Sequence, residues 1–196
     1  MATMLRVAVL LGQVAALAFA HVASAQQAPA RGGFWYALGI GEGWAQVSCT
    51  ICKGQQQPGL SAHLRLGGSL SRHVVIAGEG AAWQRNTDGV RQTLASLGAA
   101  AYWYPGRRRT PLYLKGGLGF VTHRAEDGTD AITSTGFGPQ MGLGYEFAVG
   151  RRLFFAPFFN VGWGVWFGSV KFNGAQAINP ATVTFAQLGL GLTGRP

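Results

Sequence analysis

Charged side chains are rare in this sequence, and four of them are spaced so that they could meet in pairs. Only 12% of the 196 residues are charged, about half of the roughly 25% in an average soluble domain. Arg65 and Glu79 flank the short segment SLSRH at similar distances, and Lys115 and Glu146 flank a longer segment in the same way. Each pair could be a buried structural pair, since unpaired buried charges are costly, or it could serve as a pore gate or an acid–base pair. The structural reading is favoured.

The two cysteines of the sequence, Cys49 and Cys52, form a CxxC motif. A zinc site needs about four ligands, and no second pair of Cys or His lies nearby. A redox site favours a helix start that lowers the pKa of a thiol, whereas Gly and Gln follow this motif. In an oxidising compartment the pattern favours a local disulfide, with metal binding or redox activity as alternatives.

The remaining candidates for chemistry gather between residues 123 and 134. Glu126, Asp127 and Asp130 could hold a cation only if several carboxylates converge, so we expect them to be solvated. His123 and Ser134 are the only Ser/His pair that could be constructed for acyl chemistry, and their spacing is unspecific. We therefore predict no catalytic residues, no metal site and no cofactor.

The first 25 residues have the features of a secretory signal peptide. A short basic start precedes an apolar run, and the small residues of ASA follow it at positions 23–25. The apolar run is shorter than the roughly 20 residues that a spanning helix needs. We predict a signal peptide at 1–25, a short lead at 26–32 and one exported domain at 33–196.

The predicted exported part is rich in glycine and aromatic residues, and bulky residues alternate along it with small or polar ones. Gly accounts for 31 residues and aromatics for 12%, which suits strands and tight turns better than helices. Alternation with a period of two indicates strands, and each segment could cross a bilayer, which takes about 9–11 residues. The eight predicted strands cover residues 33–45, 58–70, 73–85, 90–104, 112–124, 135–148, 152–166 and 181–193.

These strands have one bulky face and one small or polar face, as in GFGPQMGLGYEF at 136–147. A soluble barrel would turn the glycines and isolated charges to water, with few of the charges that give solubility. In lipid the order inverts, so that apolar side chains point out and polar ones fill the interior. Besides the charged pairs, the predicted interior holds His63, Gln92, Gln140, Asn160 and Gln187.

The connections alternate in length, which is typical of membrane barrels. SLSRH, YPGRRRTP and FAVGRR are short, whereas QVSCTICKGQQQPG, AEDGTDAITS and GSVKFNGAQAINP are predicted to be long loops. NTDG is the exception, a short turn on the long-loop side. The net charge of +9 gathers partly in the short turns, and no nucleic-acid-binding motif accompanies it. Aromatic girdles at the membrane interfaces are predicted from Trp35, Tyr36, Trp44, Trp103, Tyr104, Trp163 and Trp166.

The sequence therefore predicts an all-β, eight-stranded antiparallel up-and-down transmembrane barrel. With its export signal, strand count, loop asymmetry and the terminal FAQLGLGL run, it resembles the small outer-membrane β-barrel proteins of the OmpA-like or OmpX-like class. The resemblance implies a place in the bacterial outer membrane, contact with its lipid, and insertion by the barrel assembly machinery.

Three functions are compatible with such a barrel. The favoured one is a structural or surface-interaction protein with a largely plugged lumen, which presents loops near 46–57 and 167–180 to a surface partner. A narrow channel or transporter of a small apolar ligand is the first alternative. An outer-membrane lipid-modifying enzyme is the second. We expect a protein that is not an enzyme.

Overall fold

The computed structural model describes residues 33–49, 54–106, 111–178 and 180–195. The predicted signal peptide and lead lie outside these residues. No helix in the described part of the chain is long and apolar enough to span a membrane. The described residues form the strands β1 (Phe34–Cys49), β2 (Gln57–Ser69), β3 (Val74–Thr87), β4 (Val90–Trp103), β5 (Leu112–Asp127), β6 (Asp130–Tyr145), β7 (Phe147–Ala148), β8 (Leu153–Gly164), β9 (Trp166–Phe172), β10 (Ala175–Ile178) and β11 (Ala181–Gly194).

These strands close into an antiparallel barrel with eight strands around its wall, and we call each of these eight wall strands a stave. From β1 to β6 each strand pairs with the next, and β8 with its continuation β9 forms the seventh stave beside β6. The eighth stave, β11, pairs with β8 on one side and with β1 on the other, from Tyr36 opposite Gly194 to Cys49 opposite Ala181. Closure leaves no open sheet edge along the staves, which hydrocarbon surroundings require. The predicted fold class is confirmed.

The two faces of each strand follow the predicted alternation. On β2, Ser61, His63 and Arg65 are buried inside, whereas Leu64 and Leu66 point outward and are about half exposed. Glycine makes room inside the barrel: a Cβ atom at Gly43 would lie 2.7 Å from the Trp83 ring. The exposed bulky side chains therefore cover the outer surface of the barrel.

The predicted long loops were partly wrong, because most of their residues continue the strands. AEDGTDAITS carries β5 to Asp127 and starts β6 at Asp130, with a tight turn that contains Gly128 at φ 59°. GSVKFNGAQAINP likewise contains most of β9 and all of β10, which are joined by Asn173 and Gly174 with φ of 46° and 85°. Two consecutive residues with positive φ are the signature of a two-residue hairpin turn. These segments are thus hairpins and not irregular loops.

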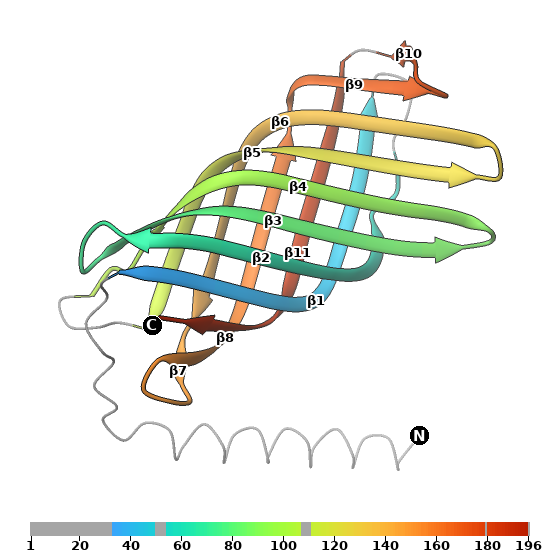
Figure 1. Ribbon diagram of the computed structural model, residues 1–196. Coiled ribbons are helices and arrows are strands. Elements are labelled where there is room, and N and C mark those ends of the chain that lie inside the picture. Colours follow the sequence, from blue (N-terminus) through green and yellow to red (C-terminus); the bar gives the residue numbers. More distant parts are fainter. Residues whose placement is uncertain (1–32, 50–53, 107–110, 179, 196) are drawn as a thin grey trace, which may run out of the picture.

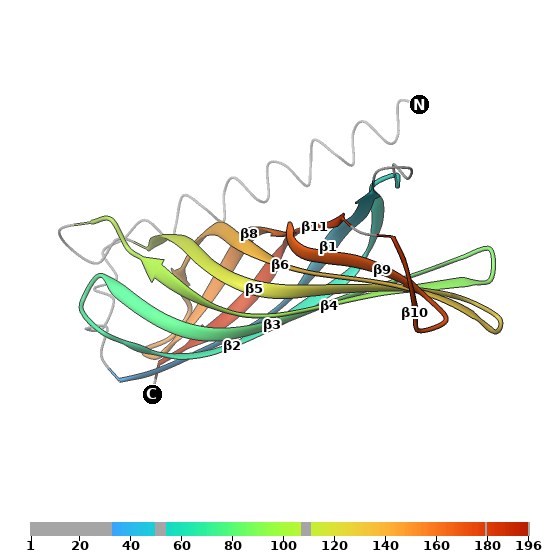
Figure 2. The same cartoon turned by 90° about the horizontal axis from the view of Figure 1, so that it is seen from above.

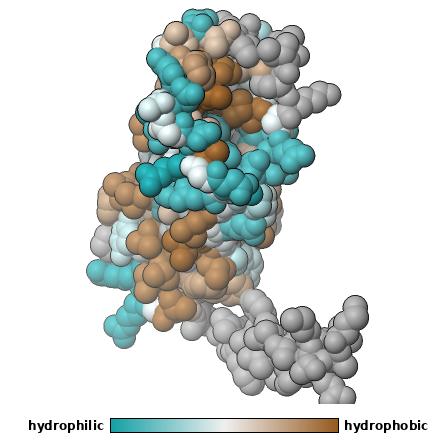
Figure 3. Space-filling view, turned by 90° about the vertical axis from the view of Figure 1, so that its right-hand side faces the viewer, coloured by the Kyte–Doolittle hydropathy of each residue, from teal (hydrophilic) through white to brown (hydrophobic). Residues whose placement is uncertain are grey.

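The hairpins extend the barrel wall at one end only. In Figure 1 the β3–β4 and β5–β6 hairpins run to the right beyond the rest of the barrel, while the β2–β3 turn and the C-terminal end lie on the left. Figure 2 shows the same hairpins projecting together on one side. Figure 3, which faces the hairpin tips, shows hydrophilic residues over the middle of the view and hydrophobic residues gathered below them.

Candidate functional site

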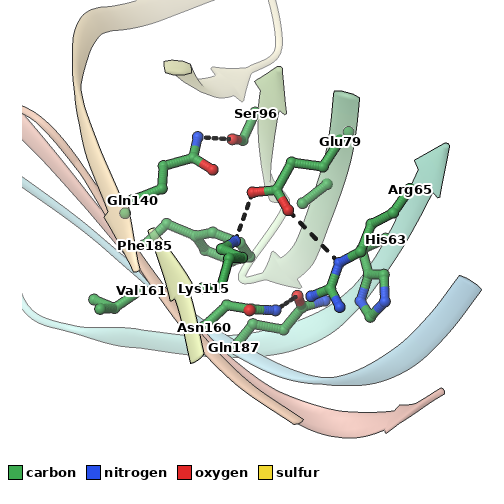
Figure 4. A pocket seen from close by; sticks show the side chains of 13 residues that line it. His63, Arg65, Glu79, Ser96, Lys115, Gln140, Asn160, Val161, Phe185 and Gln187 are labelled. Carbon is green, nitrogen blue, oxygen red and sulfur yellow. Dashed lines mark hydrogen bonds and ion pairs between the residues drawn. The ribbon is translucent and has the colours of Figure 1, made fainter. Parts of the chain in front are cut away.

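The centre of the barrel interior holds a cluster of charges around Glu79 (Figure 4). Lys115 Nζ donates a hydrogen bond of 2.5 Å to Glu79 Oε1, and the Tyr102 hydroxyl donates one of 2.6 Å to Oε2. Arg65 Nε lies 3.6 Å from Oε2, and Arg65 Nη1 donates to the Tyr113 hydroxyl at 3.1 Å. All five side chains are buried. One carboxylate thus faces two cations.

Strand register explains why these side chains meet. Arg65 on β2 lies directly opposite Glu79 on β3, and Tyr102 on β4 lies directly opposite Lys115 on β5. Glu79 itself faces Gly98, which has no side chain, and its carboxylate contacts Tyr102, four residues along β4. The structure therefore brings Arg65 and Glu79 together, as their spacing around SLSRH predicts.

The predicted pair of Lys115 with Glu146 does not form. The β5–β6 turn is centred between residues 128 and 129, so Lys115 lies opposite Gly142 and not opposite Glu146. Glu146 lies just past the end of β6, where Arg195 Nη2 binds its Oε2 and the Tyr104 hydroxyl donates to its Oε1 at 2.8 Å. The sequence reasoning placed the turn centre about two residues too late and missed Arg195.

A chain of amides continues the polar cluster across the interior. Asn160 Nδ2 donates to Gln187 Oε1 at 3.3 Å, and Gln187 Nε2 donates to Ser61 Oγ at 3.0 Å. Gln140 Nε2 donates to Ser96 Oγ at 3.0 Å. His63 stands edge-on to the Phe158 ring, with 4.3 Å between ring centroids. We call these residues and the charges around Glu79 the polar layer; a small cavity of about 20 Å³ lies within it.

An aromatic layer closes the interior on the short-turn side of the polar layer. The Trp35 and Tyr102 rings lie 4.9 Å apart, and Tyr113 lies 5.5 Å from Tyr102 and 5.8 Å from Tyr104. Trp35, Tyr102 and Tyr104 are fully buried. The prediction that Trp35 and Tyr104 belong to the outer girdles was wrong, because the alternation of β1 and β4 turns both residues inward.

An apolar layer closes the hairpin side. Trp83 is almost fully buried and donates from Nε1 to the Gly43 carbonyl at 2.9 Å. The other members of this layer are Ala45, Leu94, Val121, Val183 and Phe185. Rings and apolar side chains therefore fill much of both ends of the interior, whereas the sequence predicted a polar lumen.

The proteins that share this architecture identify the fold. No protein-family model matches the sequence, and no curated protein matches it. Among solved structures, Neisserial surface protein A has a TM-score of 0.59 at 18% identity, over 84% of this chain and 99% of that one. Ail, the attachment invasion locus protein of Yersinia pestis, has a TM-score of 0.51 at 13% identity, over 83% of this chain and 99% of that one. The chain folds as a small eight-stranded outer-membrane β-barrel. At these identities the likeness concerns the fold alone.

The other predicted girdle residues of this outer-membrane barrel lie on its outer face. Trp103 and Trp166 are about half exposed, and Tyr36, Trp44 and Trp163 are partly exposed. On the hairpin side Trp166 continues a row of rings, with Phe137 4.7 Å from Phe120 and 5.9 Å from Trp166. Their role at a membrane interface remains a prediction.

The remaining candidates lie near the hairpin end of the outer-membrane barrel. Cys49 is disulfide-bonded, whereas Cys52 lies outside the described residues, so their pairing remains a prediction. No group of acids, His or Cys in the described part of the chain could hold a metal ion. Asp130 accepts a hydrogen bond from Asn173 Nδ2 at 3.0 Å.

His123 and Ser134 lie directly opposite each other on β5 and β6, both buried. His123 Nε2 lies 3.3 Å from Gln92 Oε1, and Ser134 Oγ is buried without a hydrogen-bond partner. The predicted interior position of Gln92 is therefore near the hairpins and not in the polar layer.

Several residues of the interior were not singled out by sequence reasoning. Tyr102, Tyr113, Trp83 and Phe158 all occupy inward positions of their strands. The alternation could have predicted their inward position. Each of them lies two or four residues along its strand from a predicted interior residue, or directly opposite such a residue on the neighbouring strand. The expectation that bulky rings face lipid concealed it.

Proposed function

We propose that this outer-membrane barrel is a structural and surface-interaction protein whose lumen is closed to solutes. The observation that carries this proposal is the filling of the interior by three successive layers. Rings occupy the short-turn end, paired charges and amides the middle, and Trp83 with its apolar neighbours the hairpin end. An eight-stranded barrel has an interior just wide enough for side chains to fill. The cavity of about 20 Å³ among the described residues of the polar layer has room for one or two water-sized particles and not for a nutrient.

The outer face supports a defined position in the membrane. Strand register places Leu97, Phe120, Phe137 and Trp166 side by side in one outward row. The next outward row toward the hairpin tips holds small residues and hydroxyls: Ala95, Thr122, Thr135 and Ser169. The row after that holds Thr93, Arg124, Thr133 and Lys171. This order of apolar, hydroxyl and basic rows matches the passage from hydrocarbon to phosphate-bearing headgroups.

Beyond these rows the hairpins supply a surface for a partner. The β3–β4, β5–β6 and β9–β10 hairpins project past the basic row, where Ile132 of β6 and Phe172 of β9 lie opposite each other and are 44% and 46% exposed. Exposed rings above a membrane belt are typical of interaction sites. The predicted presenting segments near 46–57 and 167–180 lie at this end, although residues 50–53 and 179 are outside the described part.

Conductance in planar bilayers tests the closed lumen. We expect the purified full chain to give no steady channel, and the Tyr113→Ala variant to give brief openings because it removes a ring from the aromatic layer. The matched control is Tyr36→Ala, which removes an outward ring of the same kind. A steady open channel in the unmodified protein would overturn the proposal and favour the narrow channel or apolar-ligand transporter.

A lipid-modifying enzyme is a second candidate, supported by the register pair of His123 and Ser134. Nucleophilic catalysis needs a hydroxyl and a base within reach of one another. Comparison of lipid extracts from cells with the protein, with Ser134→Ala and without the protein tests this candidate. We expect identical lipid profiles from all three, and a change that depends on Ser134 would establish the enzyme instead.

A further inference from the structure

The buried charges of the interior do not balance. The buried ionic side chains of the described residues are Arg65, Lys115 and Arg195 as cations and Glu79 and Glu146 as carboxylates. Arg195 and Glu146 bind one another near the short turns, so they neutralise each other. Arg65 and Lys115 share the single carboxylate of Glu79. The polar layer is left with one positive charge too many.

The same place has unused hydrogen-bond donors and unoccupied space. Arg65 Nη2 is buried and has no hydrogen-bond partner, and His63 Nδ1 is buried and unpartnered beside it. Arg65, Lys115 and His63 line the cavity of about 20 Å³, together with the amides of Gln140, Asn160 and Gln187. Figure 4 shows the Arg65 guanidinium and the Lys115 ammonium on either side of the Glu79 carboxylate.

A water molecule alone would not resolve this arrangement. A cavity needs about 10–15 Å³ to hold one water, so the space suits one or two particles of that size. Water could accept from Arg65 Nη2, but it carries no charge. An uncompensated cation inside a barrel surrounded by hydrocarbon is costly. A compact monovalent anion supplies both a hydrogen-bond acceptor and the missing negative charge. The cavity excludes larger anions by its size and divalent anions by its single excess positive charge.

We infer that the polar layer binds one small monovalent anion of the halide class beside Arg65 and Lys115. The inference goes beyond the proposed function, because it concerns what holds the interior together and not what the surface contacts. Asn160 Oδ1, a buried acceptor without a partner, would accept a hydrogen bond from a water that lies next to the anion. The anion thereby becomes part of the interior packing.

Bromide is the direct probe. Crystals of the full chain grown in sodium bromide should show one anomalous peak inside the barrel, within contact distance of Arg65 Nη2 and Lys115 Nζ. The heat-induced gel shift of the purified protein should also occur at a higher temperature in sodium chloride than in sodium gluconate of equal ionic strength, with an effect that saturates as chloride rises. A ligand that binds the folded state more tightly than the unfolded state produces such a saturating shift.

Charge variants test the direction in which the chloride effect should change. Lys115→Met removes the excess cation, so the difference between chloride and gluconate should vanish. Glu79→Gln increases the excess, so the difference should grow. Arg151→Gln removes an exposed cation at the short-turn end and should leave the difference unchanged. Equal transition temperatures in chloride and gluconate for the unmodified protein, with no bromide peak, would overturn the inference and leave water in the cavity. The diffraction result decides the matter even where a variant fails to fold.

Discussion

Lys115 and Tyr102 lie directly opposite each other on β5 and β4, and they divide the two oxygens of Glu79 between them. With Arg65 Nε near Oε2, this carboxylate has a positive or hydrogen-bonding neighbour on each oxygen. Four strands, β2 to β5, each contribute one side chain to this contact. The cluster therefore ties half of the barrel wall together from inside.

Removal of the central carboxylate should be strongly destabilising. Glu79→Gln leaves Arg65 and Lys115 without a counter-charge, and breaking a buried pair in this way costs about 3–5 kcal/mol. Urea titration of the barrel folded in lipid vesicles would measure the loss. Glu126→Gln is the matched control, because Glu126 pairs with Arg124 at the surface and exposed pairs contribute at most about 1 kcal/mol. Similar losses for both variants would contradict the central role of Glu79.

The contact of Arg195 with Glu146 should stabilise the end of β11. Arg195→Ala removes the counter-charge of the buried Glu146 carboxylate and leaves it the hydrogen bond from the Tyr104 hydroxyl, so we expect a loss of about 3 kcal/mol or more. Arg152→Ala, an exposed neighbour, should change stability by less than about 0.5 kcal/mol. The heat-induced gel shift would report both. An unchanged transition in Arg195→Ala would mean that the β1–β11 pairing needs no such support.

Glycines inside the barrel should not tolerate even one methyl group. In Gly43→Ala the new Cβ would lie 2.7 Å from the Trp83 ring and 2.9 Å from Ser61 Cβ, and overpacking of this kind costs about 1–3 kcal/mol. Gly78→Ala is the matched strand control, because nothing lies within 4 Å of its Cβ position. Urea midpoints of the two variants should differ clearly. If both behave alike, the interior is more adaptable than its packing suggests.

Because apolar residues cover the outer face, the free-energy cost of placing a charge there should depend on its position along the strand. Leu118 points outward in the apolar belt and is about half exposed, so Leu118→Arg places a cation in hydrocarbon at a cost of about 2–4 kcal/mol near the midplane. Gln84→Arg lies in the outward row of Thr93 and Arg124 and should cost less than about 1 kcal/mol. Vesicle-based unfolding would compare them. Equal and small costs would place Leu118 outside the hydrocarbon.

Sequence reasoning reached the barrel because alternation with a period of two is set by the strand itself. In the segment from Ser61 to Leu66 the alternation is unambiguous, and the structure places these residues on the inward and outward faces that the sequence predicts. The ends of the strands were harder to predict. Near the hairpin tips both faces of the strands carry polar residues, so AEDGTDAITS lacks the alternation although its backbone continues as β5 and β6.

The pairing of charges could be predicted only where the sequence also located the centre of the turn between the two strands. The turn after Ser69 is short, so Arg65 and Glu79 could be matched by counting. The turn near Gly128 could not be located within the polar segment, and an error of two residues was enough to exchange the partners of Lys115. Trp35 and Tyr104 were misplaced for a different reason: their bulk suggested lipid, although the alternation of their own strands turned them inward.

The seam between β1 and β11 constrains how the chain reaches this state. Tyr36 pairs with Gly194, so the seam joins segments separated by nearly the whole described part of the chain, and such distant pairings form slowly. Until β11 arrives, β1 and β8 each present an unpaired edge that could template pairing with other chains. Folding without aggregation therefore demands that these two edges be shielded from other chains, and formation of the seam marks the moment at which shielding ceases to be necessary.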